Sequence, residues 1–340
     1  MVLSKSKLNT DIEQTHTGVY SMAHMIEMLN GKAQMAYAGE TPWHGLGTKV
    51  PADLTPAQML EAAGLDWTVA KIPAYAEIAG QKVPVGRSAL VRSVDNAVID
   101  VVSDDWNEVQ NQEAFDFFND FVLSGDMEMH TAGSLRDGQI VWGLAKVKES
   151  FELFKGDVVE SYLLFSNFHK YGFSTDVRFT PIRVVCNNTL TLSLNSTVER
   201  MAKISHRTKF EPDNVKLMLG IAADKLAQYK EMAGFLGSKK FNDETIVDYF
   251  KRIFPVTGAT ENTKKELSKN AGIALEVLDQ QPGAEYAQGT WWQAFNTVTF
   301  MTDHVMGRNQ DTRLASSWFG TNRNLKTQAL ETAIEMAEAA

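Results

Sequence analysis

The 340-residue sequence is 44% apolar and 22% charged, and it has a formal net charge of −9 and one cysteine. Length and composition suffice for one large core or two ordinary ones and argue against a disordered chain. A lone Cys186 excludes an internal disulfide framework and fits a reducing compartment. With neither a secretory leader nor an apolar run of about 20 residues, we expect a cytoplasmic protein outside the membrane.

Residues 1–35 are expected to form a polar arm that ends in a short helix. Apolar residues recur at i, i+3, i+4 and i+7 in this segment, at Met22, Met25, Ile26 and Leu29. This spacing predicts one apolar helix face, which Gly31 would terminate. Such a face packs against the same chain or against a neighbouring subunit.

The segment ETPWHGLGTKV, Glu40–Val50, is expected to be a loop because two glycines follow Trp43 and His44. It lacks both the third glycine and the preceding strand of a dinucleotide-binding fingerprint. His44 is either a hydrogen-bonded structural histidine or a catalytic one. Both interpretations stay open.

A helix and three strands follow. In LTPAQMLEAAGLDW, Thr55 and Pro56 suit the cap and first position of a helix that ends at Gly64. Clusters of β-branched residues in WTVAKIPAYAEI, KVPVGRSALVRSV and AVIDVVS predict strands, with a hairpin turn at Asp95-Asn96.

The segment from Val94 to Met129 contains acids but no lysine or arginine. It includes a helix with an apolar face, formed by Phe115, Phe118 and Val122. The pair Asp104-Asp105 can ligate a divalent metal, although most such acids are solvated or lie near helix N-termini. Alternatively, acids such as Asp104, Asp105 and Glu108 meet a basic surface on a neighbouring copy.

Asp137-Gly138 predicts a second hairpin, before the strand DVVESYLLFSNFHK. Aromatic residues then alternate with cations. The aromatics are Phe165, Phe168, Tyr171, Phe173 and Phe179, and the cations are Lys170, Arg178 and Arg183. Rings that stack on bases, beside charges that meet phosphates, are how proteins hold single-stranded nucleic acid. Strand alternation would place about half of these rings in the core instead.

The stretch Asp176–Phe210 opposes the acidic balance of the whole chain. After Asp176, the stretch contains one acid, Glu199. Its cations are Arg178, Arg183, Arg200, Lys203, Arg207 and Lys209. This local charge favours a surface that selects anions such as nucleic-acid phosphate. The alternative is an ordinary solvated face of a strand pair. Cys186, within this stretch, suits a small buried side chain rather than a nucleophile.

The last third is predicted to be helical, with segments such as DETIVDYFKRIF and WWQAFNTVTFMTDHVMG. The second carries a polar stripe at Asn296, Thr299 and Asp303, which is either a buried hydrogen-bond network or a ligand-facing strip. Near Gly320, Arg323 and Lys326 are placed to meet phosphate.

An ordered series of segments resembles a known family. It comprises PWHGLGTKV, LTPAQMLEAAGLDW, ALVRSVDNAVIDVVSDDWNEVQNQEAFDFF, TAGSLRDGQIVWGLAKV, PIRVVCNNTL and GTWWQAFNTVTFMTDH. Together they are similar to the phage/plasmid-like proteins, a family of unknown function associated with lateral gene transfer, over Ala36–Ala337. The resemblance implies a phage or mobile-element protein in a bacterial cytoplasm, and it carries no catalytic motif.

The sequence thus predicts an α+β fold, mainly an antiparallel sheet in the first two thirds with a helical C-terminal part. We expect an N-terminal arm with a short helix over 1–35, a sheet domain over 36–210 and a helical region over 211–340 that packs on the sheet domain. In outline this is similar to phage single-strand annealing proteins, as a fold-level analogy.

The favoured function is non-catalytic binding or annealing of single-stranded DNA or RNA in replication or recombination, by a homo-oligomer with neither cofactor nor metal. Opposite charge patches favour a head-to-tail ring or filament that salt weakens. The expected contacts are Tyr171, Phe173, Arg178, Arg183, Lys203, His206, Arg207, Lys209, Arg323 and Lys326. The alternative is an enzyme or host-defence modulator with a site around His44, His206 and Asp303-His304, because no recognised catalytic motif is present to decide.

Overall fold

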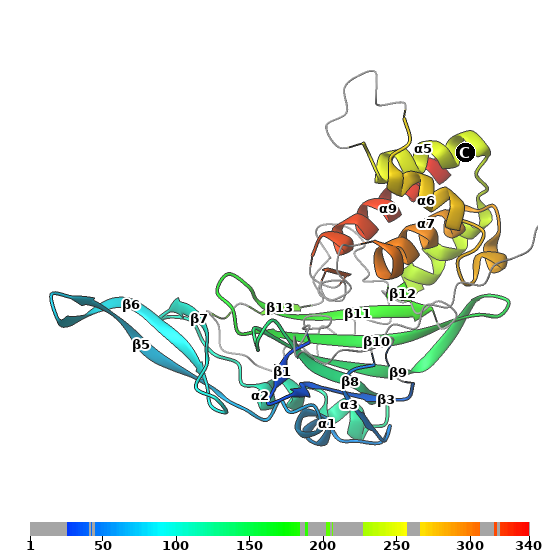
Figure 1. The fold of residues 1–340 in the computed structure, drawn as a ribbon. Helices are drawn as coiled ribbons and strands as arrows, with labels where there is room; N and C mark the ends of the chain where they lie inside the picture. Colours follow the sequence, from blue (N-terminus) through cyan, green and yellow to red (C-terminus); the bar gives the residue numbers. More distant parts are fainter. Residues whose placement is uncertain are drawn as a thin grey trace, which may run out of the picture.

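The computed structural model describes residues 26–40, 42, 45–183, 188–189, 202–204, 206, 227–256, 266–306, 316–317 and 320–339. Strands and antiparallel sheets fill the first two thirds of the chain and helices the last (Figure 1). The predicted α+β class is confirmed.

The main sheet has eight strands in the order β12-β11-β10-β9-β8-β3-β4, with β13 paired to β11 beside this path. The pairing is antiparallel except between β3 and β4. The strands are β3 (Met35–Ala38), β4 (Thr48–Val50), β8 (Met127–Leu135), β9 (Ile140–Phe154), β10 (Asp157–Phe168), β11 (Thr175–Arg183), β12 (Asn188–Thr189) and β13 (Ala202–Ile204). The predicted Asp137-Gly138 hairpin joins β8 to β9, and Arg136 and Asp137 both have positive φ there.

A separate three-stranded antiparallel sheet, which we call the arm, projects from one end of the main sheet (Figure 1). Its strands are β5 (Val69–Ile78), β6 (Gln81–Arg92) and β7 (Val98–Ser103). These are the three strands predicted from the β-branched clusters. The predicted turn at Asp95-Asn96 lies between β6 and β7, where Asn96 has a φ of 57°.

Three short helices cover one face of the main sheet: α1 (Pro56–Ala62), α2 (Asn111–Asp116) and α3 (Asn119–Leu123). Helix α1 begins as predicted, because Thr55 caps it in a reciprocal capping box with Gln58. The core beneath these helices is aromatic, with Phe117 and Phe118 packed against Phe165 of β10.

The C-terminal helices lie near β11 and β12, at the end of the strand order opposite to β3 and β4 (Figure 1). Residues 227–238 are helical, and the further elements are α5 (Asp243–Ile253), α6 (Lys269–Val277), η2 (Ala284–Ala287), α7 (Trp291–Phe300), η3 (Met301–Val305) and α9 (Thr321–Glu338). Their apolar side chains share one core with Val159 of β10 and Phe154 of β9. In the described part of the chain, no helix is long and apolar enough to cross a membrane.

The predicted N-terminal helix is wrong where the structure describes it. Met28–Leu29 form β1 and Lys32–Ala33 form β2, joined through Asn30-Gly31 with both residues at positive φ. Asn-Gly between apolar residues is a strong hairpin signal, and four apolar residues at helical spacing did not outweigh it. The earlier part of the expected helix, residues 22–25, lies outside the described residues.

Candidate nucleic-acid interface

Two aromatic rings are exposed on the turn that connects β10 to β11, residues 169–174. Tyr171 is 44% exposed and Phe173 is 43% exposed. Between them Gly172 has a φ of 81°, a backbone conformation that glycine adopts without strain. Both rings were predicted to stack on bases, and both are accessible to do so.

Each of these rings has a cation close to it. The guanidinium carbon of Arg87, on β6 of the arm, lies 5.0 Å from the centre of the Tyr171 ring. The ammonium nitrogen of Lys170 lies 5.6 Å from the centre of the Phe173 ring. These distances fall within the range of cation–π attraction. The turn therefore combines rings and positive charges that come from two distant parts of the sequence.

Hydrogen bonds and stacking fix the turn. The backbone N–H of Tyr171 donates to Oδ2 of Asp100 on β7 at 2.8 Å. Lys170 donates to the side chain of Gln139 at 3.0 Å. Phe173 stacks on the buried Phe168, with ring centres 5.2 Å apart and planes 17° from parallel. The rings are thus held in place before any ligand arrives, which reduces the entropy cost of binding.

His169, the first residue of the turn, is completely buried and ties the turn to the core. The amide nitrogen of Asn111 donates to the carbonyls of Leu65 and Trp67, so its Oδ1 must accept from Nε2–H of His169, 2.9 Å away. Burial lowers the pKa of His169 to about 3, and the nearby positive charge of Arg92 acts in the same direction. At neutral pH the ring is therefore uncharged, with its proton on Nε2.

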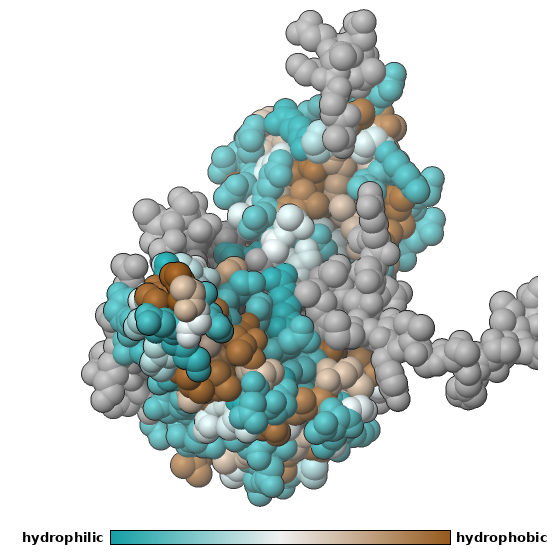
Figure 2. Space-filling view, turned by 60° about the vertical axis from the view of Figure 1, so that its left-hand side comes forward, coloured by the Kyte–Doolittle hydropathy of each residue, from teal (hydrophilic) through white to brown (hydrophobic). Residues whose placement is uncertain are grey.

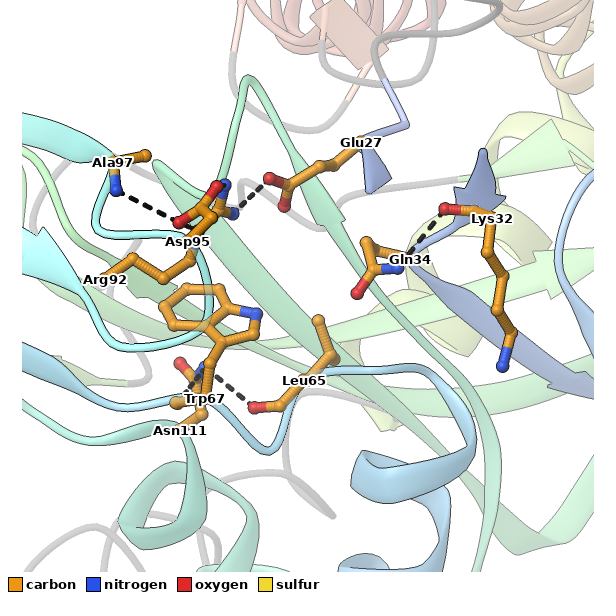
Figure 3. A network of polar contacts seen from close by, with 9 residues as sticks. All are labelled: Glu27, Lys32, Gln34, Leu65, Trp67, Arg92, Asp95, Ala97 and Asn111. Carbon is orange, nitrogen blue, oxygen red and sulfur yellow. Dashed lines mark hydrogen bonds and ion pairs between the residues drawn. The ribbon is translucent and has the colours of Figure 1, made fainter. Parts of the chain in front are cut away.

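An ionic cluster around the buried Arg92 holds the root of the arm (Figure 3). Arg92, at the end of β6, pairs with Glu27 and with Asp95, whose Oδ2 lies 2.7 Å from the guanidinium. The Arg92 guanidinium also lies 5.3 Å from the centre of the Trp67 ring. The hydrogen bonds from Arg92 hold the pKa of Asp95 below its usual value. Because Glu27 precedes β1, this cluster joins the N-terminal hairpin to the arm.

His206, one of the predicted nucleic-acid contacts, lies inside the protein, stacked on Trp106 with ring centres 4.1 Å apart. Its Nδ1–H donates to the carbonyl of Asn107 at 2.9 Å. Burial lowers the pKa of His206. An uncharged and covered histidine contributes no charge to a phosphate-binding surface.

Two predicted cations form ion pairs within the fold. Arg178 on β11 is buried and pairs with Asp176. Lys326 on α9 is 2% exposed and lies 2.5 Å from Oδ1 of Asp303, which also accepts from Ser317. Because both charges are taken up by carboxylates, we leave Arg178 and Lys326 out of the proposed interface.

The remaining predicted contacts are less well placed. Arg323 is half-buried on α9. The backbones of Arg183 and Lys203 lie on β11 and β13, but their side chains fall outside the described part of the chain. Arg207 and Lys209 lie outside it entirely, as do Cys186 and His44.

The residues of the alternative catalytic site have separate surroundings. His206 packs on Trp106 in the core beneath the sheet, whereas His304 contacts Phe300 in the helical region, with ring centres 5.1 Å apart. The polar stripe of Asn296, Thr299 and Asp303 is buried, which matches the hydrogen-bond network and not the ligand-facing strip.

The acidic segment is partly engaged within the chain. Asp104 accepts from the Ser88 hydroxyl at 2.8 Å, and Glu108 lies 3.9 Å from the ammonium of Lys71. The described residues contain no group of three or more histidine, cysteine, aspartate or glutamate side chains able to hold a metal ion.

Arg87 and Asp100 contact the candidate site, and the sequence did not reveal them. They lie 84 and 71 positions before Tyr171, and neither belongs to the basic stretch. Only the folding of the arm beside the turn brings them together. A β-hairpin with a cation on its solvent side carries no pattern that identifies its distant partner.

A comparison with known families places the chain in one of them. A model described as "Domain of unknown function (DUF932)" matches residues 98–325, which is more than half of the chain. The match begins at β7 and reaches into α9. No curated protein and no solved structure matches the chain significantly. The chain therefore belongs to the DUF932 family, whose domain is one of unknown function.

Proposed function

We propose that this protein binds single-stranded nucleic acid, without catalysis, through the aromatic–cation surface of the β10–β11 turn. The observation that carries the proposal is the pairing of two exposed rings, Tyr171 and Phe173, with two adjacent cations, Arg87 and Lys170. A base stacks on a ring through its π-face whatever its identity, while the cations meet the phosphates on either side.

The balance of charge favours single strands over duplex. Bases in a duplex are already stacked on each other, so they are not available to stack on Tyr171 and Phe173. A chain with a formal net charge of −9 also repels an extended double helix. Affinity then depends more on stacking than on phosphate contacts, and the salt dependence is modest, with a slope of about 0.7 per phosphate neutralised.

The biological setting that we propose is a phage or plasmid that uses the protein in replication or recombination. The basis is the resemblance of the ordered segments to the phage/plasmid-like proteins. The cations at Arg183, Lys203, Arg207 and Lys209 would extend the interface along the backbone of the strand. This extension can fail without affecting the stacking surface.

The experiment is a binding titration with a fluorescent oligothymidylate of about 20 nucleotides, long enough for one site, and with a duplex of equal length. We expect tighter binding to the single strand, and loss of about 1–3 kcal/mol when Tyr171→Ala or Phe173→Ala removes one stacking surface. Tyr75→Ala, at a comparably exposed tyrosine on the arm, is the matched control. Equal binding by both single variants and the control would refute the proposal.

A further inference from the structure

The elements α5, α6 and α7 lie together in the helical region (Figure 1), and their side chains line a pocket of about 450 Å³. We call it the helical pocket. Most of its lining is apolar, with Ile246 and Val247 from α5, and Leu275 and Leu278 from the last turn and the cap of α6. A mostly apolar pocket of this volume has the size of those that hold small organic molecules. Figure 2 shows apolar side chains gathered on the helical region among hydrophilic ones.

Local hydrogen bonds fix the pocket where α5 begins. Asn242 caps this helix, because its side chain accepts from the backbone N–H of Thr245 at 2.8 Å and its own N–H donates to the Thr245 hydroxyl at 2.9 Å. Just before this cap, the N–H of Phe241 donates to the carbonyl of Gly289 at 3.1 Å. The start of α5 is therefore joined by its backbone to the segment that leads into α7.

A buried amide holds another wall of the pocket. Gln293 on α7 is 2% exposed. Its Nε2 donates to the carbonyl of Leu278 at 3.0 Å and to Oδ1 of Asp279 at 2.8 Å. Its Oε1 accepts from the N–H of Gly289 at 2.7 Å. Both ends of this amide are thus engaged, and the carboxylate of Asp279 is held in place before a ligand arrives, which lowers the entropy cost of binding.

The described lining of the helical pocket is negatively charged. It contains two carboxylates, Asp243 and Asp279, and no lysine, arginine or histidine. Both carboxylates are exposed. Asp243 lies in the first turn of α5, where the helix dipole already stabilises its charge. The bond from Gln293 occupies Oδ1 of Asp279, and Oδ2 can accept from a ligand. A positive group is therefore expected to find its stronger partner in Asp279.

We propose that the helical pocket binds a small organic cation, a molecule with an apolar body and one ammonium group. The apolar body covers Ile246, Val247 and Leu275, and its transfer out of water favours binding. The ammonium group donates to Asp279, and hydrogen bonds between charged groups are stronger than neutral ones. An anion of the same shape is repelled by both carboxylates, and the formal net charge of −9 acts in the same direction.

This site stands apart from the proposed nucleic-acid surface. The helical pocket belongs to the C-terminal helices, whereas Tyr171 and Phe173 lie on the turn between β10 and β11, and no described residue contributes to both. Its test needs no oligonucleotide, so either proposal can fail while the other holds.

The experiment is a ligand-observed NMR titration of the full chain with three probes of nearly equal shape. They are the cation 2-phenylethylammonium, the neutral 2-phenylethanol and the anion phenylacetate. For a cation of this size we expect a dissociation constant on the order of 1 mM. The neutral probe should bind about threefold more weakly, as for loss of an exposed charge pair, and the anion more weakly still. Added salt should narrow these differences, because it screens exposed charges.

Substitutions locate the contact. Asp279→Asn keeps an acceptor for Gln293 and removes the charge, so it should weaken binding of the cation about threefold and leave the neutral probe unchanged. Glu244→Gln removes an exposed acid of α5 that is not part of the described lining, and is the matched control. Val247→Trp fills the pocket from α5, and Leu275→Trp fills it from α6. Each should abolish binding of all three probes, with circular dichroism to check that the variant is folded.

Two kinds of result would overturn the proposal. The first is equal affinity for the three probes, or a cation titration without saturation up to about 20 mM. The second is binding of the cation that survives Asp279→Asn together with a folded tryptophan variant, because the cation would then bind elsewhere on the acidic surface.

Discussion

The β10–β11 turn and the junction of η3 with α9 each contain a lysine, and the two lysines differ in burial and in partner. In the turn, Lys170 lies beside the exposed Phe173, and its hydrogen-bond partner in the described part of the chain is a neutral amide, that of Gln139. At the junction, Lys326 is 2% exposed and pairs with the carboxylate of Asp303. The first lysine keeps a charge that a ligand can use. The charge of the second is consumed in the fold, so its loss should affect stability and not binding.

The largest effect should come from the buried pair. Lys326→Met removes the lysine from the buried ion pair with Asp303, which should lower the free energy of unfolding by about 3–5 kcal/mol. Urea denaturation followed by circular dichroism measures this loss. Adding Asp303→Asn should recover much of this loss, because the negative charge of the buried carboxylate is then removed as well.

The matched change in the turn is Lys170→Met, for which we expect a stability change within about 0.5 kcal/mol, as for an ordinary surface substitution. Similar losses of stability for Lys326→Met and Lys170→Met would end the distinction between the two regions.

Aromatic residues allow the same comparison between an exposed side chain and a buried one. Tyr171→Ala should weaken single-strand binding by about 1–3 kcal/mol and leave the unfolding transition nearly unchanged, because the ring is exposed. Phe165→Ala, in the aromatic core of the same strand pair, should instead cost about 3–5 kcal/mol of stability. Parallel titrations of binding and unfolding measure the two effects, and a loss of folding in Tyr171→Ala would return this ring to a structural role.

Acid should destabilise the support of the turn. The pKa of His169 is about 3 in the folded protein and about 6.5 in an unfolded chain. Between these values the unfolded state binds the extra proton, so the free energy of unfolding falls as the pH falls below about 6.5. One such histidine removes about 1–2 kcal/mol between pH 7 and pH 5, and the lowered pKa of His206 acts in the same direction.

Urea denaturation at pH 7 and pH 5 tests this dependence. In His169→Gln, an uncharged amide can still donate to Asn111, so the loss of stability at pH 5 should shrink by the share of His169. An equal pH dependence in the variant and the parent protein would show that this histidine is not the group responsible.

The smallest effect concerns the two cations beside the rings. Lys170→Ala and Arg87→Ala should each reduce the slope of binding against salt by about 0.7, the value for one phosphate contact on a single strand. Lys155→Ala, an exposed lysine at the opposite end of β10, should leave the slope as it is. The titration runs between about 50 and 200 mM salt, where phosphate contacts are resolved. An unchanged slope in both variants would show that the two cations contact the aromatic rings and not the phosphates.

Local chemistry made much of the fold predictable. The capping box at Thr55, the turn at Asp137-Gly138 and the β-branched strands of the arm each depend on neighbouring residues, and the structure confirms them. The N-terminal helix failed because its apolar spacing competed with Asn30-Gly31, a turn signal that decides the conformation within two residues.

The candidate site was predictable only in part. Aromatics interleaved with cations could be read from neighbouring positions, and Tyr171 and Phe173 were predicted on that basis, whereas their exposure could not be read. The burial of Arg178 and Lys326 could not be read, because a cation looks the same in the sequence whether it faces solvent or forms an ion pair inside the fold, with Asp176 on its own strand or with Asp303 on another element. For the same reason Arg87 escaped notice, since its partner ring belongs to a turn more than eighty residues away.

The central claim is that bases stack on the rings of the β10–β11 turn, and photo-cross-linking tests it most directly. An oligonucleotide that contains iodinated uracil is bound to the full chain and irradiated. The base then forms a covalent link to an aromatic ring on which it is stacked. Trypsin cleaves after Lys170 and Arg178, so both rings fall in one peptide, YGFSTDVR. We expect the adduct in this peptide, with its yield reduced in Tyr171→Ala or Phe173→Ala. Efficient cross-linking confined to other peptides would contradict the account.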